Sequence, residues 1–258
     1  MKRNRILSIY EKNQLFKYGF KEADLLTKGE LPVEYLTGFV EFTSLKLKVN
    51  QNVLIPRVET EELIVLMKDF CFLLKDKLSY LEVGTGSGAI SLAFYDFLKK
   101  QDKIDIDKFV ISDLSLSALN LARENFQNLF GDEVKNQIKF LQSNLLSDCP
   151  HCKFNLIVAN LPYIPSHLIR SLEASVKNYE PLLALDGGST GFELINKFLE
   201  QIISKNILAD ESKIFLEVHE THTVDFIRKN FSNIVKNFLI EEFDDQFGRH
   251  RFLVLKKT

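Results

Sequence analysis

The sequence predicts an α/β fold: a mostly parallel seven-stranded sheet with helices on both faces and one antiparallel strand. From Ser79 onward, apolar runs of strand length alternate with longer segments whose apolar residues recur at helical spacing. Most of these runs contain a single polar residue among apolar ones, a composition close to that expected for strands buried on both faces. Repeated βα units favour a parallel sheet covered by helices. The last two runs flank a short polar turn and predict an antiparallel pair that leaves a reversed strand at the sheet edge.

The elements follow in order along the chain. Strands are expected at residues 80–83, 109–112, 138–141, 154–159, 214–218, 234–243 and 251–255. Helices are expected at residues 59–75, 89–98, 115–130, 190–204 and 221–230.

The chain before these elements is less regular. Residues 2–20 and, more weakly, 21–28 have helical spacing, and alternation over residues 41–53 predicts a β-hairpin with its turn at 50–52. We therefore expect three units: a short helical segment over residues 1–33, a hairpin linker over 34–57 and a main domain over 58–258. The helical segment is too short for a large core, so we expect it to pack on the main domain or to cap a substrate cleft.

Composition narrows the class of protein. The 258 residues are 45% hydrophobic and 26% charged, which is ordinary for a soluble globular protein. The net charge of −2 gives no global basic field that would indicate stable nucleic-acid binding. No apolar run approaches the length of a membrane span, and the basic N-terminus lacks the apolar core of a signal peptide. Three cysteines, an odd number, predict a reducing, cytoplasmic location.

One stretch carries distinctive chemistry, because the apolar run 154–159 is followed at once by Asn160-Leu161-Pro162-Tyr163. Pro162 has no N–H and biases Leu161 away from helical angles, so the chain is extended and leaves the sheet ladder. A carboxamide, a free carbonyl and an aromatic ring should therefore project from the C-terminal end of a strand, where ligands bind in open α/β sheets. An amide NH2 held between the Asn160 side-chain oxygen and a backbone carbonyl, with Tyr163 against its face, would point its nitrogen in one direction. The alternative is a strand-ending turn with a core tyrosine.

A second stretch, residues 82–88, runs from a strand through three glycines into a helix. Glycines there let the backbone approach a ligand closely. The spacing G-x-G-x-G lacks the glycine of the dinucleotide signature, which would fall at Ala89, and no P-loop lysine follows. Asp113 ends the next strand and can accept two ribose hydroxyls. Together these residues favour an adenosine-type ligand without a pyrophosphate over a plain tight turn.

These features together resemble those of class I S-adenosylmethionine-dependent methyltransferases, which have a Rossmann-like fold. A larger set of sequence segments is similar to those of the release factor glutamine N5-methyltransferases, the PrmC/HemK family. The matching segments span most of the chain in the family's order, namely residues 34–38, 53–63, 81–90, 160–164, 179–181, 184–188 and 248–251.

The resemblance implies an activity: transfer of a methyl group from S-adenosylmethionine to the glutamine amide nitrogen in the GGQ motif of peptide chain release factors. It also implies which residues bind the cofactor, namely Glu82, Val83, Gly84, Thr85, Gly86 and Gly88 near the methionine part, Asp113 at the ribose, Asn144 and Leu145 near the adenine, and Asn160. The implied substrate-binding residues are Asn160, Leu161, Pro162 and Tyr163, of which Asn160, Pro162 and Tyr163 would be catalytic.

Two positions depart from the family pattern. Asn144 stands where the family usually has an acidic residue, and Leu161 replaces the first proline of its Asn-Pro-Pro-Tyr motif. Leucine keeps the backbone carbonyl that would accept a hydrogen bond, although the turn loses rigidity. Asn-Leu-Pro-Tyr also occurs in rRNA adenine dimethyltransferases. The alternatives are therefore an rRNA or DNA adenine N6-methyltransferase and a non-catalytic binding protein of the same fold. Residues 55–57 and 180–181, and the lack of a basic C-terminal domain, argue against the adenine enzymes.

Other residues are weaker candidates for a functional role. Residues 149–152 form a C-x-x-C, but no second ligand pair is apparent, so we expect a surface turn and no metal site. Arg57 and Glu180 either shape the site or form a buried structural pair. Arg249 and Arg251 are expected to fix the final hairpin.

Overall fold

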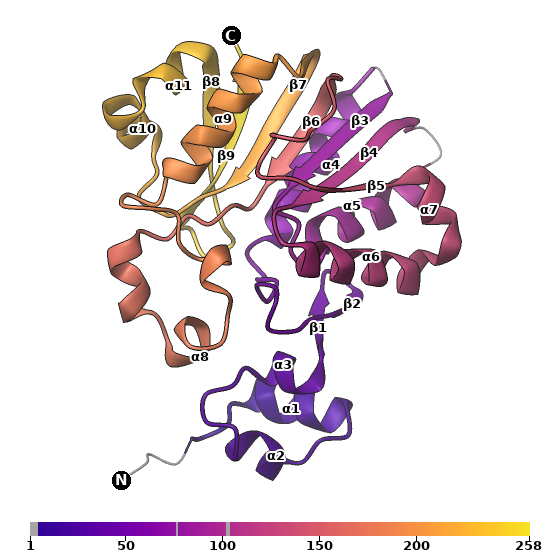
Figure 1. Cartoon of the computed structure of the whole chain (residues 1–258), viewed down its shortest axis with the longest axis vertical. Coiled ribbons are helices and arrows are strands. Elements are labelled where there is room, and N and C mark those ends of the chain that lie inside the picture. The colour runs from indigo at the N-terminus through magenta and orange to yellow at the C-terminus, as the bar shows by residue number, and fades with distance from the viewer. Residues whose placement is uncertain (1–4, 76, 102–103) are drawn as a thin grey trace.

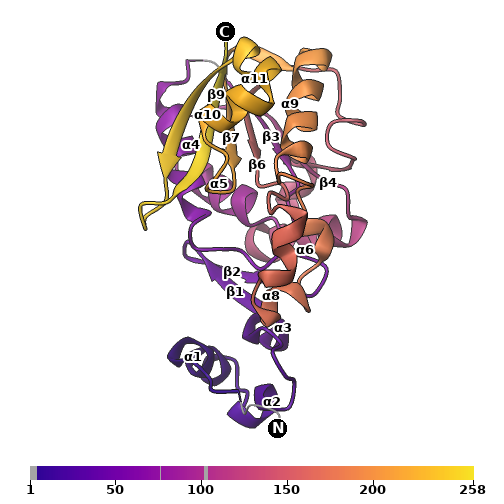
Figure 2. The same ribbon diagram turned by 90° about the vertical axis from the view of Figure 1, so that its left-hand side faces the viewer.

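The computed structural model describes residues 5–75, 77–101 and 104–258. Within these residues an α/β unit is joined at one end by a small helical part that contains the N-terminal elements (Figures 1 and 2). The sheet of the α/β unit has the order β5-β4-β3-β6-β7-β9-β8, which confirms seven strands, mostly parallel, with one antiparallel strand. Its strands are β3 (Leu78–Val83), β4 (Ile106–Asp113), β5 (Lys139–Gln142), β6 (Phe154–Ala159), β7 (Leu208–Glu217), β8 (Phe238–Asp244) and β9 (His250–Lys257).

The reversed strand is not at the edge, and that part of the prediction was wrong. β9 pairs antiparallel with both β7 and β8, so it lies between them, and β8 is the edge strand. Burial explains the order: four consecutive residues of β9 are buried, whereas β8 is mostly exposed or half-buried. A continuous apolar strand fits the interior of a sheet and a more polar one fits its edge.

Helices cover both faces of this sheet. One layer contains α4 (Glu61–Leu73), α5 (Ala89–Lys99) and α6 (Leu116–Phe130), followed by η1 (Gly131–Glu133) and α7 (Val134–Gln137). The other contains α9 (Glu193–Lys205), α10 (Val224–Asn230) and α11 (Ser232–Asn237). The expected strand at 234–243 was therefore wrong over its first residues, which belong to α11.

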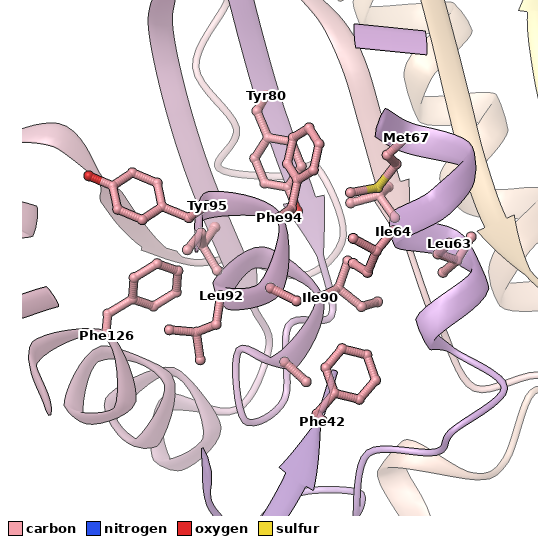
Figure 3. Close-up of a cluster of buried hydrophobic side chains, with 14 of the residues drawn as sticks. Phe42, Leu63, Ile64, Met67, Tyr80, Ile90, Leu92, Phe94, Tyr95 and Phe126 are labelled. Atoms are coloured by element: carbon pink, nitrogen blue, oxygen red, sulfur yellow. The ribbon is translucent and has the colours of Figure 1, made fainter. Parts of the chain in front are cut away.

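The core divides between these two layers because side chains alternate along each strand. On β3, Tyr80 belongs to the cluster under α4, α5 and α6, and Leu81 to the cluster under α9 to α11. Figure 3 shows Tyr80 beside Phe94 of α5, with Tyr95 of the same helix on the side of Phe126. The buried sheet and its two helical layers fix the strand ends from which the site is built.

The N-terminal part consists of α1 (Ile9–Lys17), α2 (Glu22–Leu26) and α3 (Val33–Thr37), followed by the hairpin β1 (Phe39–Phe42) and β2 (Leu45–Lys48). The three helices enclose a small core of their own, made of Leu7, Leu15, Leu25 and Val33. Helices were expected over 2–20 and 21–28, of which residues 2–4 lie outside the described residues, whereas α3 was not expected.

The hairpin turn lies at residues 43–44 and not at 50–52, so its expected position was wrong. Thr43 takes a left-handed φ of 57° there. Residues 50–52 follow the second strand instead and lead toward the main domain.

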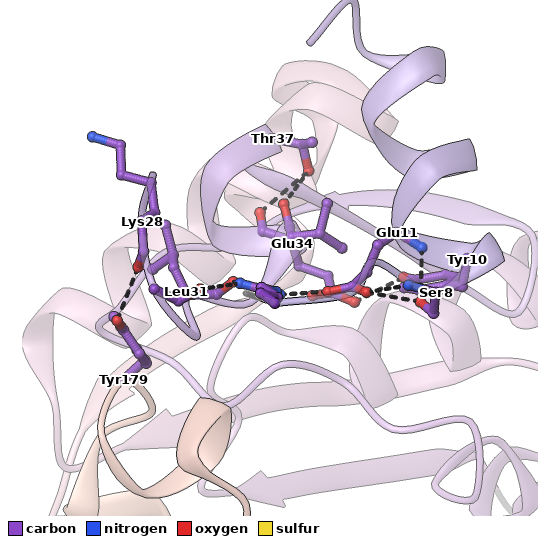
Figure 4. A network of polar contacts seen from close by, with 11 residues as sticks. Ser8, Tyr10, Glu11, Lys28, Leu31, Glu34, Thr37 and Tyr179 are labelled. Atoms are coloured by element: carbon purple, nitrogen blue, oxygen red, sulfur yellow. Dashed lines mark hydrogen bonds and ion pairs between the residues drawn. The ribbon is translucent and has the colours of Figure 1, made fainter. Parts of the chain in front are cut away.

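Polar contacts hold the N-terminal part together (Figure 4). The Arg5 guanidinium donates to the carbonyl oxygens of Gly29 and Leu31 and to the Glu11 carboxylate. The Tyr179 hydroxyl donates to the Lys28 carbonyl oxygen at 3.0 Å and so joins this part to the segment after β6. That segment contains η2 (Ser166–Ser171), α8 (Ala174–Lys177) and η3 (Leu182–Ala184). Among the described residues no helix combines the length and hydrophobicity needed to cross a bilayer.

Candidate active site

A cavity of about 310 Å³ opens at the C-terminal ends of β3, β4 and β6. Its wall combines segments far apart in the sequence: the glycine turn after β3, the ends of β4 and β6, the loop after β5, the link between β2 and α4, and η3 with its neighbours. This position agrees with the general placement of ligands beyond the carboxyl ends of strands in open α/β sheets.

The glycine turn is held tightly against the end of β4. The N–H groups of Gly84 and Thr85 donate to the Ser112 carbonyl oxygen at 2.9 and 3.0 Å. Gly84 has a φ of +79°, and a Cβ there would lie 3.1 Å from Leu161 Cδ2. Only glycine combines this backbone angle with so close an approach. The turn after β3 and the turn after β6 are therefore packed directly against each other.

Asp113 is oriented by the backbone on both sides of it. Its Oδ2 accepts from the Gly86 N–H and its Oδ1 from the Ser115 N–H, each at 2.8 Å. Burial raises the pKa of Asp113, and these N–H groups act in the opposite direction. The carboxylate lies in the cavity wall with lone pairs left on both oxygens.

Most of the predicted site residues line the cavity. They are Val83, Gly84, Thr85, Gly86, Asp113, Asn144, Leu145, Asn160, Leu161 and Pro162. Three predicted residues do not line it: Glu82, Gly88 and Tyr163.

Each of these three residues makes other contacts. Glu82 is fully buried, and its Oε2 accepts from the hydroxyls of Thr85 and Ser91. A Cβ on Gly88 would lie 3.2 Å from Ala122 of α6, so this glycine lets α5 and α6 approach. The roles predicted for all three toward cofactor or substrate stay predictions.

Asn160 is the first member of a chain of polar contacts beneath the cavity. Its Nδ2 lies 3.5 Å from Thr60 Oγ1, the Thr60 hydroxyl donates to Glu217 Oε2 at 2.6 Å, and the Tyr163 hydroxyl donates to Glu217 Oε1 at 2.8 Å. Burial raises the pKa of Glu217, and the two hydroxyl donors oppose that rise. The chain ties the turn after β6 to the start of α4 and the end of β7.

The backbone after Asn160 leaves an acceptor available. Leu161 is buried, and no described residue donates a hydrogen bond to its carbonyl oxygen. A loop over residues 185–191 pairs with the chain just beyond: Ile164 N–H donates to Leu185 O at 3.1 Å, and Gly187 N–H donates to Ile164 O at 3.0 Å. This pairing anchors the chain immediately after the turn that contains Leu161.

Arg57 and Glu180 form an ion pair. Arg57 Nη2 donates to Glu180 Oε1 at 2.5 Å, and the Ile55 N–H lies 3.3 Å from Glu180 Oε2. The Glu180 side chain is 1% exposed, whereas Arg57 also lines the cavity. The pair therefore fits both expected roles, because it is a buried ion pair and also holds the Arg57 guanidinium at the cavity.

The remaining candidates lie elsewhere. The cysteines at 149 and 152 are free thiols, and burial raises the pKa of Cys149 to about 11. The described part of the chain holds no group of three or more His, Cys, Asp or Glu residues suited to a metal ion. Arg249 and Arg251 lie 3.8 and 3.5 Å from the Asp245 carboxylate in the β8–β9 hairpin, as expected.

Sequence reasoning assigned no site role to Thr60 or Glu217, and it missed several cavity-lining residues, among them residues 51–54. The sequence did contain a signal for Glu217, because it is a lone carboxylate near the end of an otherwise apolar run. Thr60 carried none beyond its place near the start of a helix.

Comparisons with known proteins agree with this geometry. Residues 65–174 match a family model described as the methyltransferase small domain. A release factor glutamine methyltransferase from Lactococcus lactis is 34% identical over 227 residues, covering 87% of this chain and 77% of the relative. One from Leptospira interrogans is 32% identical over 249 residues, covering 95% and 82%. The human MTRF1L release factor glutamine methyltransferase is 31% identical over 241 residues, covering 88% and 68%.

Solved structures show the same fold at low identity. A ribosomal protein L11 methylase from Lactobacillus delbrueckii has a TM-score of 0.52 at 19% identity, over 78% of this chain and 80% of that one. The fold and the site define a class I methyltransferase. Within that class, the chain belongs to the release factor glutamine methyltransferase family.

Proposed function

We propose that this protein transfers a methyl group from S-adenosylmethionine to the side-chain amide nitrogen of the glutamine in the GGQ motif of peptide chain release factors. The main support for this proposal is a pair of hydrogen-bond acceptors on the turn after β6, at the cavity. Asn160 offers its side-chain oxygen and Leu161 its carbonyl oxygen, beside a glycine turn and a carboxylate suited to an adenosine-type ligand.

The residues present fit S-adenosylmethionine. Gly86 lines the cavity, and a Cβ built on it meets no atom within 4 Å, so the turn leaves open space for a ligand. Asp113 offers two oriented oxygens for ribose hydroxyls, and Asn144 and Leu145 offer an amide and an apolar face for an adenine. When bound, S-adenosylmethionine supplies an electrophilic sulfonium methyl group; transfer breaks its C–S bond and leaves neutral S-adenosylhomocysteine.

The task of the chain itself is to position a weak nucleophile. An amide nitrogen attacks poorly because its lone pair is delocalised into the carbonyl. Asn160 Oδ1 and the Leu161 carbonyl accept the two N–H groups and aim the lone pair at the methyl carbon. Such positioning can lower a barrier by up to ~7–11 kcal/mol. The nitrogen becomes positive as its bond to carbon forms and then releases a proton to water, so the site needs no strong base.

The test is Asn160→Ala, assayed by transfer of labelled methyl to release factor and, separately, to rRNA. We expect wild-type protein to label the release factor, and the variant to lose transfer while its cofactor affinity falls less. Asn120→Ala, on the exposed face of α6, is the matched control and should keep full activity. Wild-type turnover in Asn160→Ala would refute the role of Asn160, and labelling of rRNA instead of release factor would favour the adenine enzyme.

Partner and location are part of the same proposal. A release factor is the protein substrate, and a net charge of −2 supports the absence of stable nucleic-acid binding. The free thiols at positions 71, 149 and 152 support a reducing, cytoplasmic location. We assign residues 58–258 to the methyltransferase domain, with the helical segment 1–33 and the hairpin linker 34–57 attached to it.

A further inference from the structure

Glu217 determines the direction of two hydrogen bonds beneath the cavity. Its carboxylate is 1% exposed, and it accepts from Thr60 at one oxygen and from Tyr163 at the other. Both hydroxyls are the donors in these contacts, and each has only one proton to donate. Burial and the nearby Glu217 carboxylate raise the pKa of Tyr163 well above its ordinary value, so its hydroxyl keeps the proton it donates.

This arrangement fixes what Thr60 can offer to Asn160. A threonine hydroxyl has one proton, and Thr60 uses it in the hydrogen bond to Glu217. Its oxygen lone pairs can therefore only accept a hydrogen bond from Asn160. The amino end of the Asn160 amide therefore faces Thr60 Oγ1, at 3.5 Å. A reversed amide would place two acceptor oxygens against each other. Asn160 Oδ1 has no donor among the described residues, and Asn160 lines the cavity.

We infer that Thr60 and Glu217 are positioning residues that hold the Asn160 amide with its oxygen toward the substrate, and so make the site select a glutamine amide over a glutamate carboxylate. The inference rests on the proposed function for the identity of the substrate. An amide N–H donates to Asn160 Oδ1, whereas a carboxylate oxygen is repelled by it. A site built to receive a donor rejects an analogue that lacks one, because its own polar group is left unpaired.

The test measures selectivity by binding, so it does not depend on turnover. Full-length protein with saturating S-adenosylhomocysteine is titrated with a release factor carrying glutamine in the GGQ motif and with the same factor carrying glutamate. Wild-type protein should bind the glutamine form more tightly. Thr60→Val removes the hydroxyl at nearly constant shape and should narrow the ratio of the two affinities about 10-fold, the scale of one hydrogen bond. Thr60→Ser should restore the wild-type ratio.

Two more variants keep the inference open to refutation if Thr60→Val folds poorly. Glu217→Gln leaves one of the two hydroxyls without an acceptor and should narrow the same ratio. Ser79→Ala removes a buried hydroxyl that donates to Asp107 at the opposite end of β3, and should leave the ratio unchanged. A wild-type ratio in Thr60→Val or Glu217→Gln, or equal affinities in the wild type, would overturn the inference. Preferential binding of glutamine without methyl transfer would refute the proposed function alone.

Discussion

Replacing Gly191 by alanine should displace the turn after β6 that carries Asn160, while every side chain of that turn stays the same. Gly191 lies in the loop that pairs with the chain beyond Pro162, and its φ is +85°. A Cβ there would lie 2.2 Å from the Tyr163 carbonyl oxygen, whereas ordinary contact begins at 3.4 Å. The two atoms must therefore separate by at least 0.8 Å to reach 3.0 Å, and by 1.2 Å to reach ordinary contact. Because a misplacement of about 1 Å can cost on the order of 10²-fold in rate, we expect kcat for methyl transfer to fall by about that factor.

The assay is transfer of labelled methyl to release factor, with cofactor affinity measured by calorimetry on the same protein. Gly38→Ala is the matched control, because Gly38 has a φ of +78° and its Cβ would meet nothing within 4 Å. Both variants carry the left-handed penalty of about 1–2 kcal/mol in stability, but only Gly191→Ala should lose transfer. Transfer at the wild-type rate in folded Gly191→Ala would show that the loop does not position the turn.

Three further predictions concern charge. Asp113→Asn should weaken S-adenosylmethionine binding about 10-fold or more in calorimetry, because the ribose hydroxyls would donate to a neutral amide oxygen in place of a charged carboxylate. An unchanged affinity would contradict the assignment of Asp113 to the ribose. Burial raises the pKa of Glu82 from 4.5 to about 7, so the native state holds this proton more tightly than the unfolded chain does. The free energy of unfolding should therefore fall by about 3 kcal/mol as pH rises from about 4.5 through 7, and Glu82→Gln should remove that fall in urea titrations. Arg57→Met leaves the Glu180 carboxylate buried without its ion-pair partner and should lower the free energy of unfolding by about 1–3 kcal/mol. The expected loss is smaller than for a fully buried pair because 34% of the Arg57 side chain is exposed. Equal urea midpoints for the variant and the wild type would argue against a structural role of the pair.

The strands and the glycine turn could be predicted from the sequence, because each depends on residues that are neighbours in the chain. β6 is apolar except for Asn155 and is buried at every residue, as expected for a strand covered on both faces. Residues 84–86 follow the end of β3 and Asp113 ends the neighbouring β4, and parallel pairing brings such strand ends together at one edge of the sheet.

The errors arose where one local pattern suits two structures. Apolar residues at 234, 235 and 238 fit either alternation or helical spacing, and tertiary packing under α9 decided for α11. An antiparallel pair alone fits either strand order in the final hairpin, and only the more continuous apolar run of β9 indicates that it is the inner strand. Thr60 and Glu217 are 157 residues apart, so their hydrogen bond became visible only once the fold had joined them.

The position of β9 has a consequence for synthesis on the ribosome. β8 is made before β9, yet it reaches the sheet only through β9, so it has no partner until the later strand has emerged. Until then β7 presents an unpaired apolar edge, the kind of surface that recruits other chains. Arg251, the second residue of β9, lies beside the Asp245 carboxylate and is made in the same step. A nascent chain stalled between β8 and β9 should therefore depend on a chaperone far more than one in which the hairpin is complete.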